Sequence, residues 1–250
     1  MENRMETHAH DLHKAPGKNF WHYFFEFFML FLAVSAGFFV ENFRDHLVDR
    51  KHEKEYMQSL MNDLSTDITH IDSVIFRDTE TKQQCDSLFM LLSLNDYSDK
   101  TGSIYFNARK ISLRYFFYIT DGTLKQLNNA GGLRLIRFQD VVDSINGYEN
   151  RNAELQKVQD LKESQLSGYR EACENVFDVK VFESMVHGTF LQRPTVNPKL
   201  FSQDPKDINQ LLIRAHYLKR NNSGIIASLE ELRRRAVNLQ ALIRKEYELK

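Results

Sequence analysis

The strongest pattern in the chain is a long apolar run at residues 20–40, with the sequence FWHYFFEFFMLFLAVSAGFFV. Four of its residues are not apolar: His22, Glu26, Ser35 and Gly37. A helix of this length spans about 30 Å, the thickness of the hydrocarbon core of a bilayer. Aromatic residues at its start are typical of a membrane interface, and the polar residues that end it are Glu41, Asn42 and Arg44. The pattern predicts a single transmembrane helix at residues 20–40, after a polar tail at residues 1–19.

Two other structures fit an apolar run of this kind. One is a buried core helix, which needs apolar partners on all of its faces. The other is a cleaved signal peptide, for which Val34, Ser35 and Ala36 supply a suitable small-residue site. Because the apolar run continues through Val40, we expect an uncleaved membrane anchor.

The positive charges on the two sides of the span are nearly equal in number, so they favour one orientation of the chain only slightly. The tail carries Arg4, Lys14 and Lys18, and the first residues after the span carry Arg44, Arg50, Lys51 and Lys54. The positive-inside comparison is close to a tie once the terminal amine is counted. A short tail before a large domain suits a signal anchor, so we expect the tail in the cytoplasm and residues 41–250 outside.

Three residues within the span indicate contacts with lipid or with another helix. A carboxylate such as Glu26 is expensive in a membrane, so it faces a partner, a water path or the headgroups, which it can reach from about 9 Å depth. Ala33 and Gly37 form a small-xxx-small pair that lets two helices approach closely. We expect the span to self-associate on this face, and Asn42, just after the span, is a further candidate for a membrane or oligomer contact.

Helical periodicity continues after the span. Residues 41–56 are rich in charges of both signs and contain no Gly or Pro, which predicts a charged helical stalk. An apolar seam with spacings of three and four follows, at Met57, Met61, Leu64, Ile68, Ile71 and Ile75. A shorter second helix is expected around residues 88–92, and residues 95–102 (NDYSDKTG) predict a loop.

The middle of the chain predicts further helices within a bundle domain at residues 57–177. Residues 103–120 are assigned to a helix, although residues 111–119 are rich in strand formers and leave a strand open. Thr120 or Asp121 caps a short helix that ends at Gly131 and Gly132. A long helix is expected at residues 138–177, and residues 178–203, with two prolines and no clear periodicity, are expected to be a linker.

The last helix, in residues 204–250, has the most regular seam. Asp204 and Pro205 are a typical N-cap and first helical residue. The seam residues are Ile208, Leu211, Ala215, Leu218, Asn222, Ile225, Leu229, Leu232, Ala236, Leu239 and Ile243. Such a heptad pattern suits an oligomeric coiled coil or a core-facing helix of an intramolecular bundle. Asn222, its polar member, is of the kind that fixes register, and the candidate oligomer contacts of this helix are Asn222, Leu229 and Leu232.

The composition and the motifs of the chain argue against several classes of function. The net charge of −1 gives no global case for nucleic-acid binding, and ten glycines and four prolines in 250 residues favour long helices. No phosphate loop, dinucleotide fingerprint, nucleophile elbow or zinc helix is present. His8, His10 and His13 lie in the polar tail, where we expect no metal. Cys85 and Cys173 either form one disulfide or remain as buried single thiols.

Two motifs resemble those of an uncharacterised family of bacterial single-pass membrane proteins. The first is Glu26, fourteen mostly apolar residues, then Glu41, Asn42 and Phe43, followed by the charged stalk that leads into Leu60, Asp63 and Leu64. The second is LNNAGGLRLI at residues 127–136. The resemblance covers residues 22–150 and implies a bacterial inner membrane location with the tail in the cytoplasm and the C-terminal domain in the periplasm.

These observations predict an all-α protein: a transmembrane helix that continues into a charged stalk and a helical bundle with a long C-terminal helix. We expect a non-enzymatic scaffold or interaction subunit that self-associates or joins a larger membrane complex, with membrane lipid as a partner and no cofactor. The alternative is a ligand-sensing or channel-like protein whose helical domain acts on the span. No catalytic residues are predicted, because no acid, base and nucleophile form a recognisable set.

Overall fold

The computed structural model describes residues 20–129 and 131–249, and it is all-α apart from one two-stranded hairpin in that part of the chain. The chain divides into two units at residues 52 and 53. The polar tail at residues 1–19, with its three histidines, lies outside the described residues. Residues 53–250 are called the bundle unit below.

The N-terminal unit consists of the first part of helix α1, Phe20–Leu92. It contains a helical stretch long and apolar enough to cross a membrane, and no residue of that stretch is buried. Residues 41–56, expected as a helical stalk, are helical as well. The bundle unit begins at Glu53 rather than at residue 57, because the Glu53 carboxylate is buried against the backbone of Arg137 and the hydroxyl of Tyr247.

The expected separate helix at residues 88–92 is wrong, because α1 continues without a break to Leu92. Its seam simply continues beyond Val74, and the buried positions that extend it are Asp78, Thr81, Cys85 and Leu88. Three of these four are not aliphatic, so the sequence pattern fades while the helix does not. The expected loop follows, and α2, Thr101–Ile111, begins at its end.

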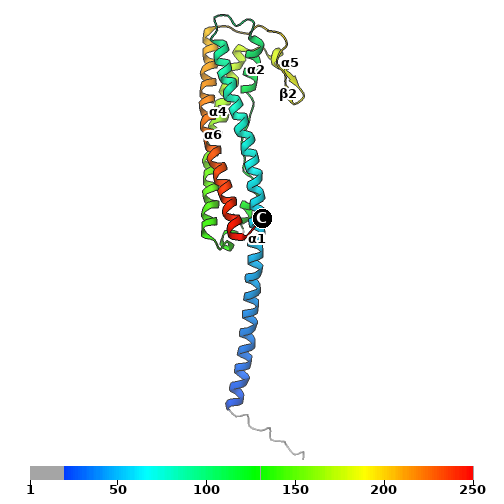
Figure 1. Ribbon diagram of the computed structural model, residues 1–250, viewed down its shortest axis with the longest axis vertical. Helices are drawn as coiled ribbons and strands as arrows, with labels where there is room; N and C mark the ends of the chain where they lie inside the picture. Colours follow the sequence, from blue (N-terminus) through cyan, green and yellow to red (C-terminus); the bar gives the residue numbers. More distant parts are fainter. Residues whose placement is uncertain (1–19, 130, 250) are drawn as a thin grey trace, which may run out of the picture. The chain divides into compact units, whose positions relative to one another are not determined.

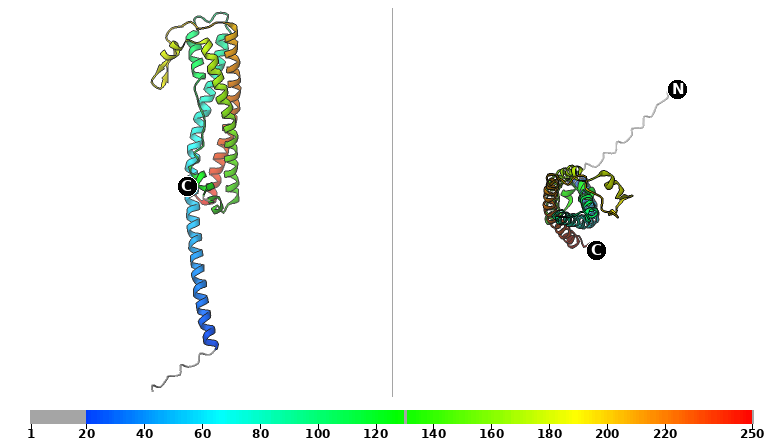
Figure 2. Two further views of the ribbon diagram at one scale, coloured as in Figure 1. Left: turned by 180° about the vertical axis from the view of Figure 1, so that it is seen from behind. Right: turned by 90° about the horizontal axis from the view of Figure 1, so that it is seen from above.

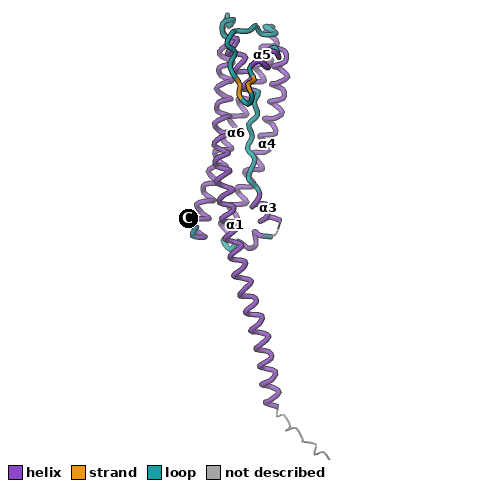
Figure 3. The backbone as a smooth tube through the Cα atoms, turned by 90° about the vertical axis from the view of Figure 1, so that its right-hand side faces the viewer, coloured by secondary structure: helices purple, strands orange, loops and turns teal. Residues whose placement is uncertain are grey.

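The helix expected at residues 103–120 is only half correct. Helix α2 ends at Ile111, and residues 112–121, called the extended segment below, form neither helix nor strand. This segment runs along the bundle as a teal tube that leads to α3, Gly122–Asn129 (Figure 3). The predicted left-handed glycine is confirmed, since Gly131 has φ of 68° and precedes the 3-10 helix Gly132–Leu135.

Two long helices complete the bundle unit. Helix α4, Gln139–Val176, matches the prediction, and α6, Pro205–Tyr247, begins where Asp204 accepts a hydrogen bond from the Lys206 amide at 2.8 Å. α6 runs antiparallel to the last part of α1, because Arg233 bonds Asp72 and Lys219 bonds Asp86. Helices α1, α4 and α6 lie side by side in the bundle unit (Figures 1 and 2). The extended segment, with α2 and α3, takes the fourth position of an up-down-up-down bundle.

The expected linker at residues 178–203 contains structure that the sequence reading missed. Helix α5, Val179–Ser184, is capped by Asp178, whose side chain accepts from the Lys180 amide. Strands β1, Val186–His187, and β2, Phe190–Leu191, pair antiparallel. The tight turn between the strands needs Gly188, which has φ of 61°.

Candidate functional site

The contact residues predicted in the N-terminal part of the chain, which include Asn42 just after the span, are exposed on α1. Ala33, Gly37 and Asn42 lie on its surface, and a Cβ added at Gly37 meets nothing within 4 Å. His22 lies 4.0 Å from the Glu26 carboxylate, one helical turn away, and both side chains are more than half exposed. Glu26, Ala33 and Gly37 follow one another at spacings of seven and four, so they share one exposed face of α1, whereas Asn42 lies on a different face.

The predicted seam residues of α6 have a different environment. Asn222, Leu229 and Leu232 are completely buried inside the bundle unit. Of the two arrangements that the heptad pattern left open, the structure has the intramolecular one. All three side chains therefore face their own chain, and the assignment of Asn222, Leu229 and Leu232 as oligomer contacts is corrected.

Asn222 belongs to a buried polar layer that separates two hydrophobic clusters of the bundle unit. The layer consists of the core-facing residues Asp78, Thr81, Gln159, Lys162 and Asn222. One cluster holds residues 57–74 of α1 and the other begins at Cys85. Lys162 donates to Asp78 at 2.5 Å and to the carbonyl of Tyr115 at 2.9 Å. Burial raises the pKa of Asp78 and lowers the pKa of Lys162. The charge of each residue opposes the shift of the other.

A cavity of about 580 Å³ lies at the opposite end of the bundle unit from α3, where α5 covers the last turns of α2 and α4. The apolar part of its wall is formed by Phe177, Val179, Phe182, Val186 and Phe201. This volume falls within the range of small-molecule sites, roughly 300–1,000 Å³. The cavity is the best-formed candidate site in the described chain.

The aromatic wall of the cavity is fixed by packing behind it. Tyr105 is completely buried, and its ring meets Phe177 edge-on at 5.0 Å and Phe182 at 5.8 Å. The Tyr105 hydroxyl donates to the Lys199 carbonyl at 3.0 Å and accepts from the Asp178 amide at 3.1 Å. These bonds tie the start of α5 and the segment before α6 to α2, so the cavity is held open by a satisfied hydrogen-bond network.

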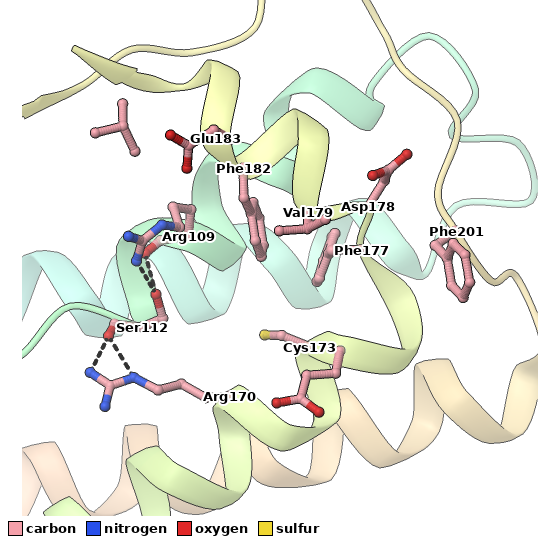
Figure 4. Close-up of a pocket in the computed structure, with 12 residues that line it drawn as sticks. Arg109, Ser112, Arg170, Cys173, Phe177, Asp178, Val179, Phe182, Glu183 and Phe201 are labelled. Carbon is pink, nitrogen blue, oxygen red and sulfur yellow. Dashed lines mark hydrogen bonds between the residues drawn. The ribbon is translucent and has the colours of Figure 1, made fainter.

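Two guanidinium groups lie on either side of Ser112 at one end of the cavity (Figure 4). Arg170 donates two hydrogen bonds to the Ser112 carbonyl, at 2.8 and 3.2 Å, and Arg109 donates to the Ser112 hydroxyl at 2.8 Å. Ser112 is the first residue of the extended segment and is buried. The end of α2 therefore places both cations beside an apolar wall.

The thiol at the floor of the cavity has low reactivity. Cys173 lines the cavity with a buried thiol, and burial raises the pKa of that thiol to about 12. Burial also raises the pKa of the Cys85 thiol to about 12, and the two cysteines are free rather than bonded to each other. A neutral thiol is a poor nucleophile, so Cys173 contributes apolar packing to the cavity.

The sequence reading missed this cavity because residues 178–203 were assigned to a linker. A signal for α5 was present: Asp178 is an N-cap residue, and the half-buried Val181 and Phe182 precede buried Met185 at helical spacing. Arg109 and Arg170 carried no motif, since they are brought together only by the path of the chain through Ser112.

No protein-family model, curated protein or solved structure matches the chain.

Proposed function

We propose that the chain is a membrane-anchored, non-enzymatic interaction subunit that self-associates through its transmembrane helix. The observation that carries the proposal is the exposure of residues 20–40 of α1. The large hydrophobic side chains exposed there include Phe20, Trp21, Phe27, Leu30, Val34, Phe38 and Val40. Side chains of this kind are stable on a helix surface only in lipid or against another helix.

The face with Ala33 and Gly37 supports contact between two copies of the span. Association of helices in lipid depends on close packing, which small side chains permit. Glu26 and His22 lie on the same helix and add polar groups that gain from a partner inside the membrane. The proposed location is a bacterial inner membrane with the bundle unit in the periplasm, and membrane lipid is the first partner.

The test is sedimentation of the full chain in mild detergent. Gly37→Ile should shift the protein toward smaller species, and Glu26→Gln should do so less, because a single interhelical polar contact averages well under about 2 kcal/mol. Ser35→Ile introduces the same isoleucine side chain on the side of the helix away from Ala33 and Gly37, and it serves as the matched control. Unchanged sedimentation of both variants would contradict self-association through the span.

The orientation is tested separately. A phosphatase fused after residue 250 is active only when it is exported. An active fusion supports a periplasmic bundle unit, whereas a stable but inactive fusion contradicts it.

A second candidate function is that of a ligand-responsive membrane protein. The observation that favours it is the cavity beside α5, which has a rigid aromatic wall and two positioned cations. Binding there, unlike assembly of the span, depends on Arg109 and Arg170. The two functions are compatible in one chain and are tested by different variants.

A further inference from the structure

We infer that the cavity beside α5 binds a single-chain amphipathic anion, with its acidic head on Arg109 and Arg170 and its apolar chain along Phe177 and Phe182. The inference rests on the second function proposed above, and it names the class of ligand. It does not depend on self-association of the span.

The first argument comes from the charges of the two guanidinium groups. Each is anchored on Ser112, which as an uncharged residue leaves the positive charge unbalanced. The arginines that form ion pairs in the described chain are others: Arg44, Arg77, Arg114, Arg137, Arg151, Arg233, Arg234 and Arg235. A guanidinium has five N–H donors, and the bonds to Ser112 use one from Arg109 and two from Arg170. The remaining donors suit a carboxylate or phosphate.

The carboxylates of the cavity argue for the same ligand class. Glu174, Asp178 and Glu183 also line it, yet none forms an ion pair with Arg109 or Arg170 among the described residues. Asp178 already accepts the Lys180 amide as the cap of α5. Glu174 and Glu183 are exposed, so water solvates them. A cationic ligand would gain little from solvated rim carboxylates that nothing holds in place. An anion instead meets half-buried Arg109 and exposed Arg170, and hydrogen bonds to Ser112 already fix both guanidinium groups.

The second argument comes from the apolar wall. Phe177 and Phe182 pack against each other at 5.2 Å and against buried Tyr105, so the wall is rigid before any ligand arrives. A surface prepared in this way binds an apolar chain without the cost of ordering side chains. Positioned cations next to a rigid apolar wall select an amphiphile. A volume of about 580 Å³ suits one chain rather than two.

The test uses the full chain in nanodiscs of phosphatidylcholine, with empty nanodiscs as the partition control. Decanoate is titrated by calorimetry, and hydrogen exchange of the peptide that covers residues 177–191 reports the site. Decanol and decyltrimethylammonium carry the same chain with a neutral or a cationic head. We expect decanoate to bind and to slow exchange in this peptide, and the other two to bind at least about tenfold more weakly, as for loss of a charge-assisted hydrogen bond.

Variants assign the effect to the cavity. Arg109→Gln and Arg170→Gln should each weaken decanoate binding about tenfold, while Arg134→Gln, on an exposed arginine of the 3-10 helix, should not. Val186→Trp fills the apolar part of the cavity and leaves the bonds to Ser112 intact, so it should also weaken decanoate binding. This variant keeps both arginines, and it therefore tests the site even if an arginine variant does not fold.

The outcomes separate the ligand class from the site and from its source. Equal binding of all three amphiphiles, or tighter binding of decyltrimethylammonium, overturns the anionic class but leaves a site. If none of the three amphiphiles binds, the site itself is overturned as well. A nanodisc with lysophosphatidylglycerol, a single-chain anionic lipid, and no decanoate distinguishes the sources: protection of residues 177–191 there assigns the anion to a membrane lipid, and protection only by decanoate assigns it to a soluble anion. Sedimentation without decanoate tests assembly independently.

Discussion

The side-chain amide of Gln159 forms two hydrogen bonds with the backbone of Phe117. Its Oε1 accepts the Phe117 N–H at 2.8 Å, and its Nε2 donates to the Phe117 carbonyl at 2.9 Å. The pair replaces the neighbouring strand that an extended segment normally requires. Both residues are buried, so Gln159 of α4 satisfies the backbone of the extended segment at Phe117, inside the bundle unit.

Gln159→Met is expected to destabilise the bundle unit by about 2 kcal/mol, because it leaves the buried Phe117 N–H without an acceptor. The Phe117 carbonyl keeps a weaker donor, Gln156, at 3.3 Å. The loss corresponds to a fall of about 4–8 °C in the melting temperature for a chain of this size. Thermal unfolding followed by circular dichroism measures it, and Lys157→Met, at an exposed position of the same helix, should leave the melting temperature unchanged.

The buried pair of Asp78 and Lys162 gives a prediction with a sign in pH. Lys162→Met leaves the Asp78 carboxylate buried without its cation, which typically costs about 3–5 kcal/mol. Burial raises the pKa of Asp78, and the lost lysine had opposed that rise. The folded variant therefore binds a proton more tightly than the unfolded chain, so its stability decreases as pH rises above the usual carboxyl range. The variant should melt at a higher temperature at pH 5 than at pH 8.

A double variant checks that the pair, rather than packing, is responsible. Asp78→Leu together with Lys162→Met removes both charges and should recover most of the stability lost in either single variant. The double variant also removes the hydrogen bond from Lys162 to the Tyr115 carbonyl, so the recovery of stability is incomplete. Simple addition of the two single losses would contradict a coupled ion pair.

Asn222 gives a prediction in the opposite direction. It is completely buried, and neither its Oδ1 nor its Nδ2 has a hydrogen-bond partner among the described residues. Asn222→Leu should stabilise the bundle unit by about 1–3 kcal/mol, since it removes two buried polar atoms without a partner. Asn221→Leu is the matched control, because Asn221 donates to the Val158 carbonyl at 3.4 Å and gains nothing from the change. A lower melting temperature for Asn222→Leu would mean that this residue is satisfied in the bundle.

Asn222 also shows how far the sequence could predict the structure. The regular spacing along α6 gave the helix, its N-cap and its buried face, because a single periodic element carries its own signal. Whether that face met another copy or its own chain depended on α1 and α4, whose seams are interrupted by Asp78, Thr81 and Lys162. A polar layer weakens the periodic signal on each helix while the helices themselves continue.

The extended segment was beyond prediction for a related reason. Residues 111–119 have the composition of a strand, and no partner strand exists in the described chain. Their partners are side chains far away in sequence: Asp67 accepts the Thr120 amide at 2.8 Å, and Gln159 binds Phe117. Hydrogen bonds between the backbone and side chains far away in the sequence leave no periodic pattern from which they could be predicted. The cavity shares this limit, since Arg109 and Arg170 meet only through Ser112.

The two buried thiols predict how the bundle unit responds to alkaline pH. Burial raises the pKa of Cys85 and of Cys173 from 9.0 to about 12. In the unfolded chain the thiols ionise near pH 9, while in the folded chain they stay neutral. The folded state therefore holds protons that the unfolded state releases, and stability falls as pH rises from about 9 toward about 12. By about pH 10 the loss is about 1.4 kcal/mol for each thiol.

Melting temperatures between pH 8 and pH 10 measure this loss as the difference between the parent and a variant without the thiols, because buried tyrosines with raised pKa values, such as Tyr148 and Tyr169, add to the decline in both. The double variant Cys85→Ala and Cys173→Ala lowers the melting temperature at every pH, because it removes buried sulfur, but it should show a shallower decline over this range. Alkylation supplies the second measurement: iodoacetamide at pH 8 should react with both cysteines in urea and only slowly in the native protein, since the thiolate is the nucleophile. An equally steep decline in the double variant would show that other groups set the alkaline response.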